Sequence, residues 1–447
     1  MYKKSITGGI ILLFLLSSSV SFVSSYEVST NNIIYVDDDG GADYTRIQDA
    51  IDNASDGNTV YVYSGTYYEN IILNKSITLE GEDCNTTIID GQKIDDVIHL
   101  TGNSTIIRGF TIMNARNGQN SDDAGIDIRS YSNIIMDNII FDNILGIYFQ
   151  VLDSNNIITN NVFDDNSLGL KLRFTSETIV SNNSFVDNYR GMRLEYVDHV
   201  NISGNTIVGE FIEGMRLDNA YSCEISTNYI FIDGSNLLTI ILDSSCSNLI
   251  DNNYIENKKN RGIGISLTWL SNGNILKKNI IKNFDYGINI FAGSGGNIIT
   301  RNIIEENSKG IHFVSECKDN TISENTIANN SQYGIHFEFS GVYESKIHHN
   351  NFLNNNIHSN AKGVNNWDDG LKGNYWDDYE EKYPDAHKKW LKGIWDTPYE
   401  IASGNNQDRY PLIKPYSKSK SYVNPLFQQF LDQHPHMFPL LRQLLRL

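Results

Sequence analysis

A short pattern that recurs about ten times between Asn138 and Asn350 constrains the fold of this chain more than any other feature. Its skeleton is Asn-x-[Ile/Phe], then Asn, then Gly-Ile-x-[Ile/Leu/Phe], and residues 156–172 hold the clearest copy. Successive copies lie 22 to 26 residues apart. A fixed period of this length is typical of a solenoid, in which each repeat buries its apolar face only against its neighbours.

Two sets of residues mark the period. The asparagines before the apolar pair are Asn138, Asn161, Asn183, Asn205, Asn228, Asn253, Asn279, Asn302, Asn325 and Asn350. The glycines are Gly125, Gly146, Gly169, Gly191, Gly214, Gly262, Gly287, Gly310 and Gly334, and one copy has Thr239 at this place. Within a copy the apolar residues alternate, as Ile311 and Phe313 do, which indicates strands and not helices.

Three short strands in each coil, stacked coil on coil, predict an all-β fold, a single-stranded right-handed parallel β-helix with three sheets. The hand follows from the crossover rule for parallel strands. About 13 coils would make a rod of roughly 60 Å at about 4.8 Å per coil. We expect the asparagines to take a tight turn, because Asn tolerates the left-handed conformation, and their stacked amides to form a hydrogen-bonded ladder.

The first residues of the chain favour export. Lys3 and Lys4, an apolar run at residues 10–16 and small residues before Tyr26 are typical of a signal peptide over residues 1–25, with an uncleaved membrane anchor as the alternative. We therefore expect an extracellular or cell-surface protein without a transmembrane span after signal cleavage. The net charge of -19 argues against nucleic acid and against an anionic membrane surface as partners.

The rest of the chain divides into four predicted segments. These are an N-terminal cap with irregular coils at 26–125, regular coils at 126–356, a C-terminal cap at 357–415, and a linker with an amphipathic tail of unknown partner at 416–447. In the first segment, Ile47, Ala50 and Ile51 follow helical spacing. We expect Thr45 and Gln48 to form a capping box and Gly57 to stop the helix, which would cover the first coil.

The four cysteines include Cys223 and Cys246, which fall in adjacent coils. Their offsets within the repeat differ, being five residues before Asn228 and seven before Asn253. A disulfide between them and a pair of buried free thiols are both compatible with the sequence.

Residues 44–91 carry a more specific pattern, from Tyr-Thr-Arg-Ile-Gln-Asp-Ala-Ile at its start to Ile-Asp-Gly at its end. This pattern resembles the opening cap of the pectin-lyase-like superfamily, and the later coils resemble its NosD branch, described as periplasmic copper-binding and as carbohydrate-binding and sugar-hydrolysis repeats. The resemblance implies a right-handed β-helix. It leaves the activity open, because the superfamily hosts lyases, hydrolases, esterases, epimerases and non-enzymes.

The C-terminal cap has its own resemblance. Asn-Trp-Asp-Asp-Gly at 366–370 and Gly-Asn-Tyr-Trp at 373–376 are similar to the closing segment of NosD-like surface proteins from archaea. An Asp-rich loop there suggests calcium, but residues 380–390 of this chain lack alternating oxygen ligands, so calcium is not expected. We expect an aromatic plug instead, formed by Trp367, Trp376, Trp390 and Trp395.

The outward positions of the Gly-Ile-x-Ile strand predict two surface columns, because strand side chains alternate between faces. Two residues after the glycine position stand Asp127, Tyr148, Lys171, Arg193, Arg216, Ile241, Gly264, Asn289, His312 and His336. Four residues after it stand Arg129, Gln150, Arg173, Glu195, Asp218, Asp243, Ser266, Phe291, Val314 and Glu338.

The middle of these columns is the first candidate site. Its ligand-binding candidates are Lys171, Arg173, Arg193, Glu195, Arg216 and Asp218; its catalytic candidates are Lys171, Arg193, Arg216, Asp218 and Asp243. Arginines in a row can bind the carboxylates of an acidic sugar chain. Superfamily lyases use a basic residue to abstract a proton beside a uronate carboxylate. The alternative is a set of mutually compensating surface ion pairs.

The second candidate is a metal site. His312 and His336 stand in neighbouring coils of one column, and Glu338 follows on the same strand. Together they could hold copper or zinc, and the NosD resemblance favours copper. Ordinary stacking of like residues is the alternative.

The known enzyme motifs of the superfamily are missing as sets. Paired aspartates with Gly-His-Gly and Arg-x-Lys are absent, and so is Asp-Pro-His; Asp122, Asp123 and Asp127 supply acidic groups alone. We therefore expect an exported cell-surface β-helix that binds carbohydrate, such as a polysaccharide or cell-envelope glycan, or serves as a structural module. A lyase or hydrolase of an acidic glycan and a NosD-like copper-handling accessory protein are the alternatives.

Overall fold

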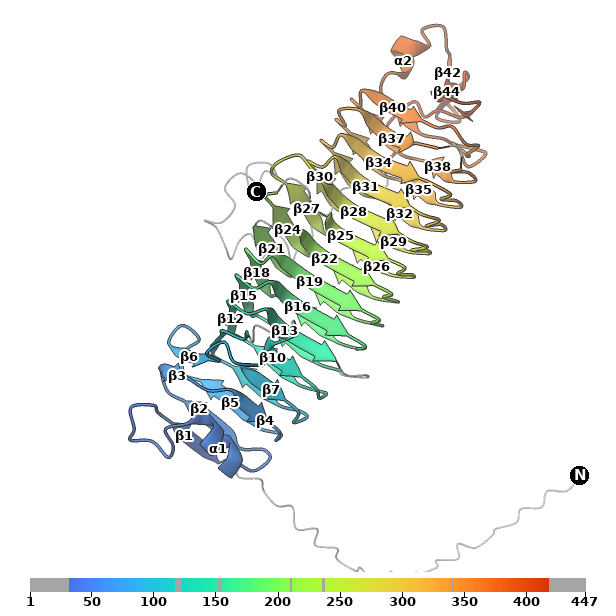
Figure 1. Cartoon of the computed structure of the whole chain (residues 1–447). Coiled ribbons are helices and arrows are strands. Elements are labelled where there is room, and N and C mark those ends of the chain that lie inside the picture. The colour runs from blue at the N-terminus through green and yellow to red at the C-terminus, as the bar shows by residue number, and fades with distance from the viewer. Residues whose placement is uncertain are drawn as a thin grey trace, which may run out of the picture.

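The structure, a computed structural model, describes residues 32–116, 122–150, 155–209, 211–234, 238–339 and 341–417. The predicted signal peptide and residues 418–447 of the predicted tail lie outside these ranges. The described chain forms a rod of stacked coils (Figure 1). Within the described ranges, no helix is both long enough and apolar enough to span a membrane.

Three parallel sheets, named sheets A, B and C in the order in which the chain visits them, run along the rod. Sheet A consists of β1 (Ile33–Val36), β2 (Thr59–Val62), β5 (Thr78–Gly81), β8 (Ile106–Arg108), β11 (Ile134–Met136), β14 (Ile157–Thr159), β17 (Ile179–Ser181), β20 (Asn201–Ser203), β23 (Glu224–Ser226), β26 (Leu249–Asp251), β29 (Ile275–Lys277), β32 (Ile298–Thr300), β35 (Thr321–Ser323) and β38 (Lys346–His348).

Sheet B consists of β3 (Gly65–Tyr67), β6 (Thr87–Asp90), β9 (Thr111–Met113), β12 (Ile139–Phe141), β15 (Val162–Asp164), β18 (Ser184–Val186), β21 (Thr206–Gly209), β24 (Tyr229–Ile232), β27 (Tyr254–Asn257), β30 (Ile280–Lys282), β33 (Ile303–Glu305), β36 (Thr326–Ala328), β39 (Asn351–Leu353) and β41 (Tyr375–Trp376).

Sheet C consists of β4 (Ile71–Leu73), β7 (Ile98–Leu100), β10 (Ala124–Ile128), β13 (Leu145–Gln150), β16 (Leu168–Arg173), β19 (Arg190–Glu195), β22 (Glu213–Asp218), β25 (Leu238–Asp243), β28 (Ile263–Thr268), β31 (Tyr286–Phe291), β34 (Lys309–Val314), β37 (Tyr333–Phe337) and β40 (Ile357–Asn360).

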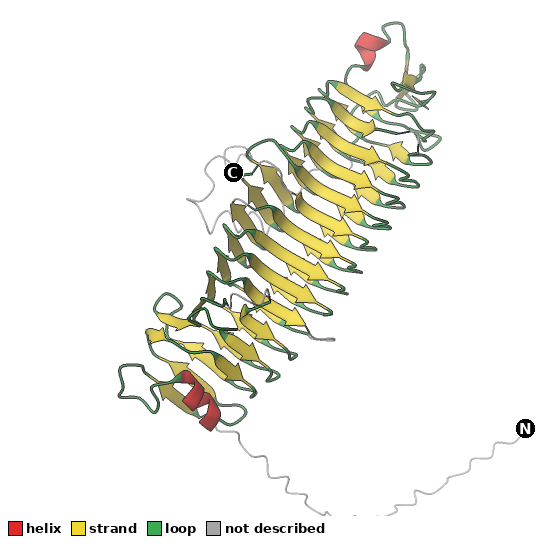
Figure 2. Cartoon of the chain, in the orientation of Figure 1, coloured by secondary structure: helices red, strands yellow, loops and turns green. Residues whose placement is uncertain are grey.

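The predicted fold class is confirmed, a right-handed parallel β-helix with three sheets. Sheets A and B have 14 strands and sheet C has 13, so the rod holds about one coil more than the sequence predicted. The few remaining elements lie near the ends (Figure 2). They are α1 (Ile47–Asn53), α2 (Tyr379–Lys382) and the short antiparallel pairs of β42 (Lys388–Lys389) with β43 (Ile394–Trp395) and β44 (Tyr399–Glu400) with β45 (Gln407–Asp408).

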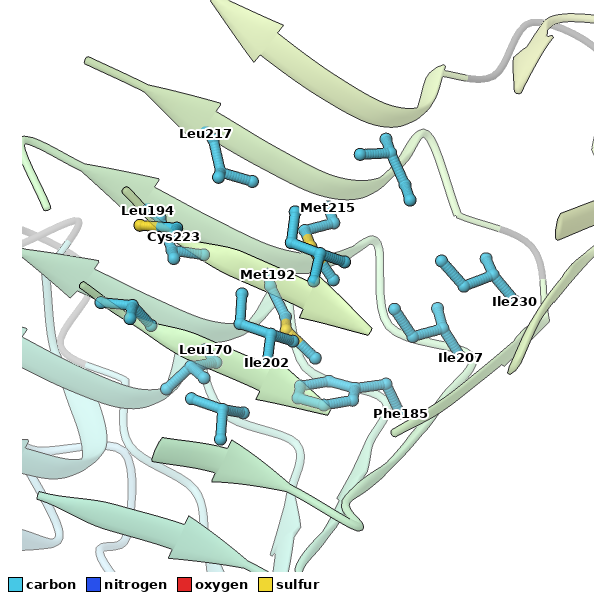
Figure 3. Packing of buried hydrophobic residues seen from close by; sticks show 14 of the residues in the cluster. Leu170, Phe185, Met192, Leu194, Ile202, Ile207, Met215, Leu217, Cys223 and Ile230 are labelled. Atoms are coloured by element: carbon cyan, nitrogen blue, oxygen red, sulfur yellow. The ribbon is translucent and has the colours of Figure 1, made fainter. Parts of the chain in front are cut away.

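The core is a continuous column of apolar side chains inside the coils. Leu170, Met192 and Met215 stand in register on successive strands of sheet C and are buried. Isoleucines and Phe185 from the other two sheets pack beside them (Figure 3). Burying one such side chain stabilises the fold by about 1.5–3 kcal/mol, so every repeat contributes to the free energy of unfolding.

The ten predicted asparagines occupy the turn between sheets A and B, where their amides form one chain of hydrogen bonds. From Asn138 onward, each Nδ2 donates to Oδ1 of the asparagine in the next coil at 2.9–3.1 Å, and the chain continues to Asn374. The prediction that these asparagines themselves adopt the left-handed conformation is wrong. The residue before each one does so, for example Asn252 with φ 57°, because the buried amide must point inward while the chain turns just ahead of it.

The glycine register needs one correction. Gly264 and not Gly262 opens its strand of sheet C, since Ile263 pairs with Tyr286 and the next glycine in the column is Gly287. A Cβ on Gly264 would lie 2.6 Å from the carbonyl oxygen of Gly287. The local sequence Gly-Ile-Gly-Ile fits the pattern in either register, so only the pairing decides. Ser266 therefore belongs in the first outward column, where Gly264 was predicted.

The N-terminal helix forms as predicted, but its cap is different. Helix α1 begins at Ile47, and Arg46 is its N-cap, whose side chain makes no capping hydrogen bond. The Glu69 carboxylate instead accepts hydrogen bonds from the backbone N–H groups of Ile47 and Gln48 at 2.8 and 3.0 Å. The capping box of Thr45 and Gln48 is thus wrong, because the helix starts one residue too late for Thr45 to be its N-cap and a more distant carboxylate takes the free donors.

The C-terminal cap buries most of the predicted aromatic plug. Trp367, Trp376 and Trp395 are buried, and the ring of Trp376 stacks on that of Tyr399 at 4.1 Å. Trp390 does not belong to the plug, because it lies in the turn between β42 and β43 and is 65% exposed. All four cysteines are free thiols in this structure.

Candidate functional site

The outer face of sheet C carries one unbroken column of side chains. Strand pairing places its members in register, one for each coil: Ile72, His99, Asp127, Tyr148, Lys171, Arg193, Arg216, Ile241, Ser266, Asn289, His312, His336 and Asn360. The predicted catalytic and ligand-binding candidates of this column therefore lie next to one another along the rod. The column divides into an acidic, a basic and a histidine section.

The basic section forms a network of ion pairs with the neighbouring column. Arg193 pairs with Glu195 at 2.8 Å and with Asp218 at 3.2 Å, and Arg173 pairs with Glu195 at 3.3 Å. Arg216 donates hydrogen bonds of 2.7 Å to both Asp218 and Asp243. Arg193 and Arg216 are each shared between two carboxylates, so guanidinium donors and carboxylate acceptors alternate in this section.

These residues line a shallow depression of about 360 Å³, which we call the arginine depression. Its lining is Arg173, Arg193, Glu195, Tyr196, Arg216, Asp218, Asn219 and Asp243. The predicted candidate Lys171 is not part of it. Its ammonium group lies 3.1 Å from Asp122 and 4.7 Å above the ring of Tyr148, and only 14% of its side chain is exposed.

Two aromatic side chains that the sequence interpretation missed border this depression. Phe174 and Tyr196 follow directly after β16 and β19, and their rings stack at 5.3 Å. Tyr196 is 53% exposed, and Trp269 at the same place of a later coil is 60% exposed. The signal was present one position beyond the outward columns, five residues after Gly169, Gly191 and Gly264.

The backbone at these aromatic positions is left-handed. Phe174, Tyr196 and Trp269 have φ of 54°, 55° and 48°, in the left-handed region that costs a bulky L-residue about 1–2 kcal/mol. Exposed rings do not repay that cost by burial. The same place is left-handed in other coils, at Asn219, Ser244, Ala292 and Ser315. The turn therefore belongs to the fold, and only the choice of a bulky residue there is left without a reason in the fold.

The acidic section at the N-terminal end of the same column was also missed as a unit. His99 Nδ1 lies 3.0 Å from Asp127 Oδ2 and 3.6 Å from Asp96, and Arg129 donates to the same Asp127 oxygen at 2.9 Å. Asp127 is buried. Burial, together with the charges of Asp127 and Asp95, raises the pKa of Asp96 to about 6 despite a hydrogen bond from the Ala124 N–H. The Ile-His-Leu alternation of 98–100 marks His99 as outward-facing.

The predicted histidine pair lies in register, with its rings stacked at 5.3 Å and an interplanar angle of 18°. The ring nitrogens of His312 already have partners, Asn289 Oδ1 at 3.0 Å and Glu338 Oε2 at 2.9 Å. Burial and the charge of Lys309 lower the pKa of His312 to about 4, and the same two causes lower that of His336 to about 4. Parallel rings aim their nitrogens side by side and not at one point, which favours stacking over a shared ion. The metal site at His312, His336 and Glu338 stays a prediction.

Comparison with known protein families gives a match over most of the rod. Residues 51–269, 196–333 and 240–381 match the family described as "Periplasmic copper-binding protein (NosD)". The matched stretches overlap and together include the regular coils and part of the C-terminal cap.

Individual relatives cover less. A "Cell surface glycoprotein" of Methanothermus fervidus is 40% identical over 78 residues, which are 17% of this chain and 13% of that protein, so the chain spans only a small part of it. Among solved structures, "a new PL6 alginate lyase complex with trisaccharide" has a TM-score of 0.53, 14% identity, and coverage of 73% of this chain and 87% of that one. An alginate lyase solved with G6 has a TM-score of 0.49, 13% identity, and the same coverage. At such identities the likeness concerns the fold.

Proposed function

The chain belongs to the NosD family, and on this premise we propose that it is an exported cell-surface protein that binds carbohydrate along the outer face of sheet C. The predicted signal peptide and the likeness to a cell surface glycoprotein support the location. A polysaccharide or cell-envelope glycan is the proposed ligand, laid along the rod so that successive sugar units meet successive coils.

The observation that carries this proposal is the aromatic platform beside the arginine depression. The stacked rings of Phe174 and Tyr196 offer an apolar surface, and Tyr adds a polar tip. Next to them, guanidinium donors and carboxylate acceptors alternate along the depression. An apolar surface flanked by a few well-placed polar groups suits a sugar ring, which has an apolar face and a rim of hydroxyl groups.

The test is retention on immobilised cell-envelope glycans and uronate polymers. We expect Tyr196→Ala and Arg193→Ala to abolish retention. Tyr189→Ala is the matched control, because Tyr189 precedes strand β19, Tyr196 follows it, and the two are 57% and 53% exposed. Equal retention of both tyrosine variants would contradict the proposal and leave a structural module. A steep loss of retention with added salt would identify the ligand as acidic.

The acidic section favours a second candidate function, which is enzymatic processing of the same glycan. A carboxyl group with a pKa of about 6 holds both protonation states near neutral pH, as a general acid or base requires. Asp96 is 20% exposed and has His99 and Asp127 beside it. The predicted catalytic candidates of the basic section would then orient the sugar chain.

The discriminating measurement is product formation from a panel of uronate polymers. We expect Asp96→Asn to lower the rate by about 10²-fold or more, and Asp95→Asn, which removes one of the charges that raise the Asp96 pKa, to lower it less. If no polymer of the panel gives a shortened or unsaturated product, or if Asp96→Asn does not change the rate, the second function is contradicted. Carbohydrate binding without turnover then remains.

A further inference from the structure

Two histidines at the end of sheet A converge in a way that the stacked pair on sheet C does not. His348 ends β38 and His349 follows it in the turn before Asn350. Their Nδ1 atoms lie 3.0 Å apart and their ring planes are inclined by 84°. Only one of the two nitrogens can donate a proton to the other, so the pair is held together by at most one hydrogen bond.

A carboxylate from the C-terminal cap completes the group. Asp369 lies in the loop that pairs beside β38, and one oxygen of it and one nitrogen of each imidazole lie within 4.8 Å of one another. Its Oδ1 accepts hydrogen bonds from the N–H groups of Leu371 and Lys372, which fixes the carboxylate, and its Oδ2 lies 3.8 Å from His349 Nε2. The adjacent Asp368 is neutralised by Arg409 at 2.6 Å.

The spacing of the nitrogens matches coordination geometry. Two ligands at about 2.0 Å from one ion are about 2.8 Å apart in a square-planar site and about 3.3 Å apart in a tetrahedral one. The observed 3.0 Å lies between these values.

We propose that His348, His349 and Asp369 bind a divalent transition-metal ion, with Cu²⁺ held most tightly. Two imidazoles and one carboxylate with open positions form a donor set that Cu²⁺ and Zn²⁺ both accept, and Cu²⁺ stands highest in the order of affinities. The description of the family as copper-binding makes copper the first ion to examine, and these residues fit it. Tyr416 packs against the His349 ring at 4.5 Å and supports its orientation.

A third histidine group of similar composition provides the contrast. His358 lies 2.8 Å from Asp377 and 3.3 Å from Asp378. The Nδ2 of Asn355 donates toward His358 Nδ1 at 3.3 Å, and the Oδ1 of the same amide is fixed by Asn330. His358 Nε2 must therefore carry the proton that it donates to Asp377, so its nitrogens are unsuited to a metal ion.

The experiment loads the tag-free purified protein with one equivalent of CuSO₄ or ZnSO₄, desalts it, and measures bound metal. We expect about one equivalent of copper and an electron paramagnetic resonance spectrum with hyperfine coupling to two imidazole nitrogens. His348→Ala, His349→Asn and Asp369→Asn should each weaken binding at least about tenfold. Asn replaces His349 because φ there is 60° and Asn tolerates this conformation.

The controls are His358→Ala and the double variant His312→Ala with His336→Ala, all of which should keep the copper. Thermal unfolding of every variant in the absence of metal separates lost ligands from lost folding. Copper retained at full occupancy by folded His348→Ala, or wild-type protein that keeps less than about a tenth of an equivalent, would overturn the proposal. Loss of copper only in the His312 and His336 variant would place the metal at the stacked pair instead.

Discussion

The turn between sheets A and B and the edge where the strands of sheet C end are both built from residues with positive φ, yet they differ in every other respect. In the first, the residue after the turn is always asparagine from Asn138 to Asn374, and its amide is buried and bonded to the next coil. In the second, the side chains vary from coil to coil, and Phe174, Tyr196 and Trp269 reach solvent.

This difference separates two kinds of constraint. At the turn between sheets A and B, each side chain must form hydrogen bonds with the coils before and after it, so asparagine is needed in every coil. At the outer edge, no neighbour imposes a residue type, and the strained aromatic rings need a reason outside the fold. We therefore expect substitutions of the buried asparagines to lower stability. Substitutions of the exposed side chains at the end of the sheet C strands should instead weaken ligand binding.

The largest effect on the free energy of unfolding is expected at the buried asparagines. Asn253→Ala removes the acceptor of two donors of Asn228 and the donor to Ile225 and Asn279. Because these partners are buried, the free energy of unfolding should fall by about 3 kcal/mol or more, measured by urea denaturation. Asn252→Gly, at the adjacent left-handed position, is the control and should change little. Similar losses in both variants would show that the amide chain contributes no more than the turn does.

At the C-terminal end of the hydrogen-bonded asparagines, the contribution to stability should depend on pH. Asp408 accepts hydrogen bonds from Asn374 N–H and Trp376 Nε1–H, and burial raises its pKa to about 7. The unfolded group has a pKa near 3.8, so the protonated form is favoured by folding, and its contribution is complete below pH 4. Stability should then fall by up to about 4 kcal/mol as the pH rises from about 4 through 7.

Urea denaturation between pH 4 and 8 measures this slope, and Asp408→Asn should reduce it to the part that comes from Asp96, whose pKa is also raised. The nearby Asp368 is paired with Arg409 and should not titrate in this window, because its pKa is lowered by Arg409 although burial opposes this. An unchanged slope in Asp408→Asn would assign the titration to another group and weaken the distinction between the inner chain and the surface.

On the outer face the effect on stability should be smaller. Arg216→Ala removes two hydrogen bonds to Asp218 and Asp243, but the arginine side chain is 23% exposed. A partly exposed ion pair contributes about 1 kcal/mol or less, so unfolding should change by that amount while glycan retention is lost. A stability loss comparable to that of Asn253→Ala would mean that this network is structural.

The smallest effect should have the opposite sign. Trp269→Gly relieves a φ of 48° at a side chain that is 60% exposed, and the flexibility of glycine in the unfolded chain offsets part of the gain. The free energy of unfolding should rise by about 0.5 kcal/mol, with weaker glycan retention. A loss of stability would show that the ring supports the fold, through its edge contact with Phe291 for example.

The parts of the structure that could be predicted from the sequence are those that depend on the repeat alone. The period and the alternation determine which residues face inward, so the fold class, the columns and the asparagine positions followed from spacing alone. Interactions between distant segments did not: Glu69 capping α1, Gly264 replacing Gly262 in the column, and Asp369 approaching His348 and His349 all depend on which segments pair. The prediction that Trp390 belongs to the plug is wrong because composition does not show which tryptophan lies in a turn.

The hydrogen-bonded asparagines give the rod a direction. Every amide in the series donates toward the C-terminal end and accepts from the N-terminal side, so the first member needs a donor and the last member needs an acceptor. At one end the backbone N–H of Phe110 donates to Asn138 Oδ1. At the other end Asn374 donates its backbone N–H to the carboxyl group of Asp408 and its Nδ2 to the carbonyl oxygen of Trp367. Whole coils can therefore be inserted or removed between these ends without leaving a polar group unmatched, whereas the two caps cannot be exchanged. The length of such a rod is free to vary, and its polarity is not.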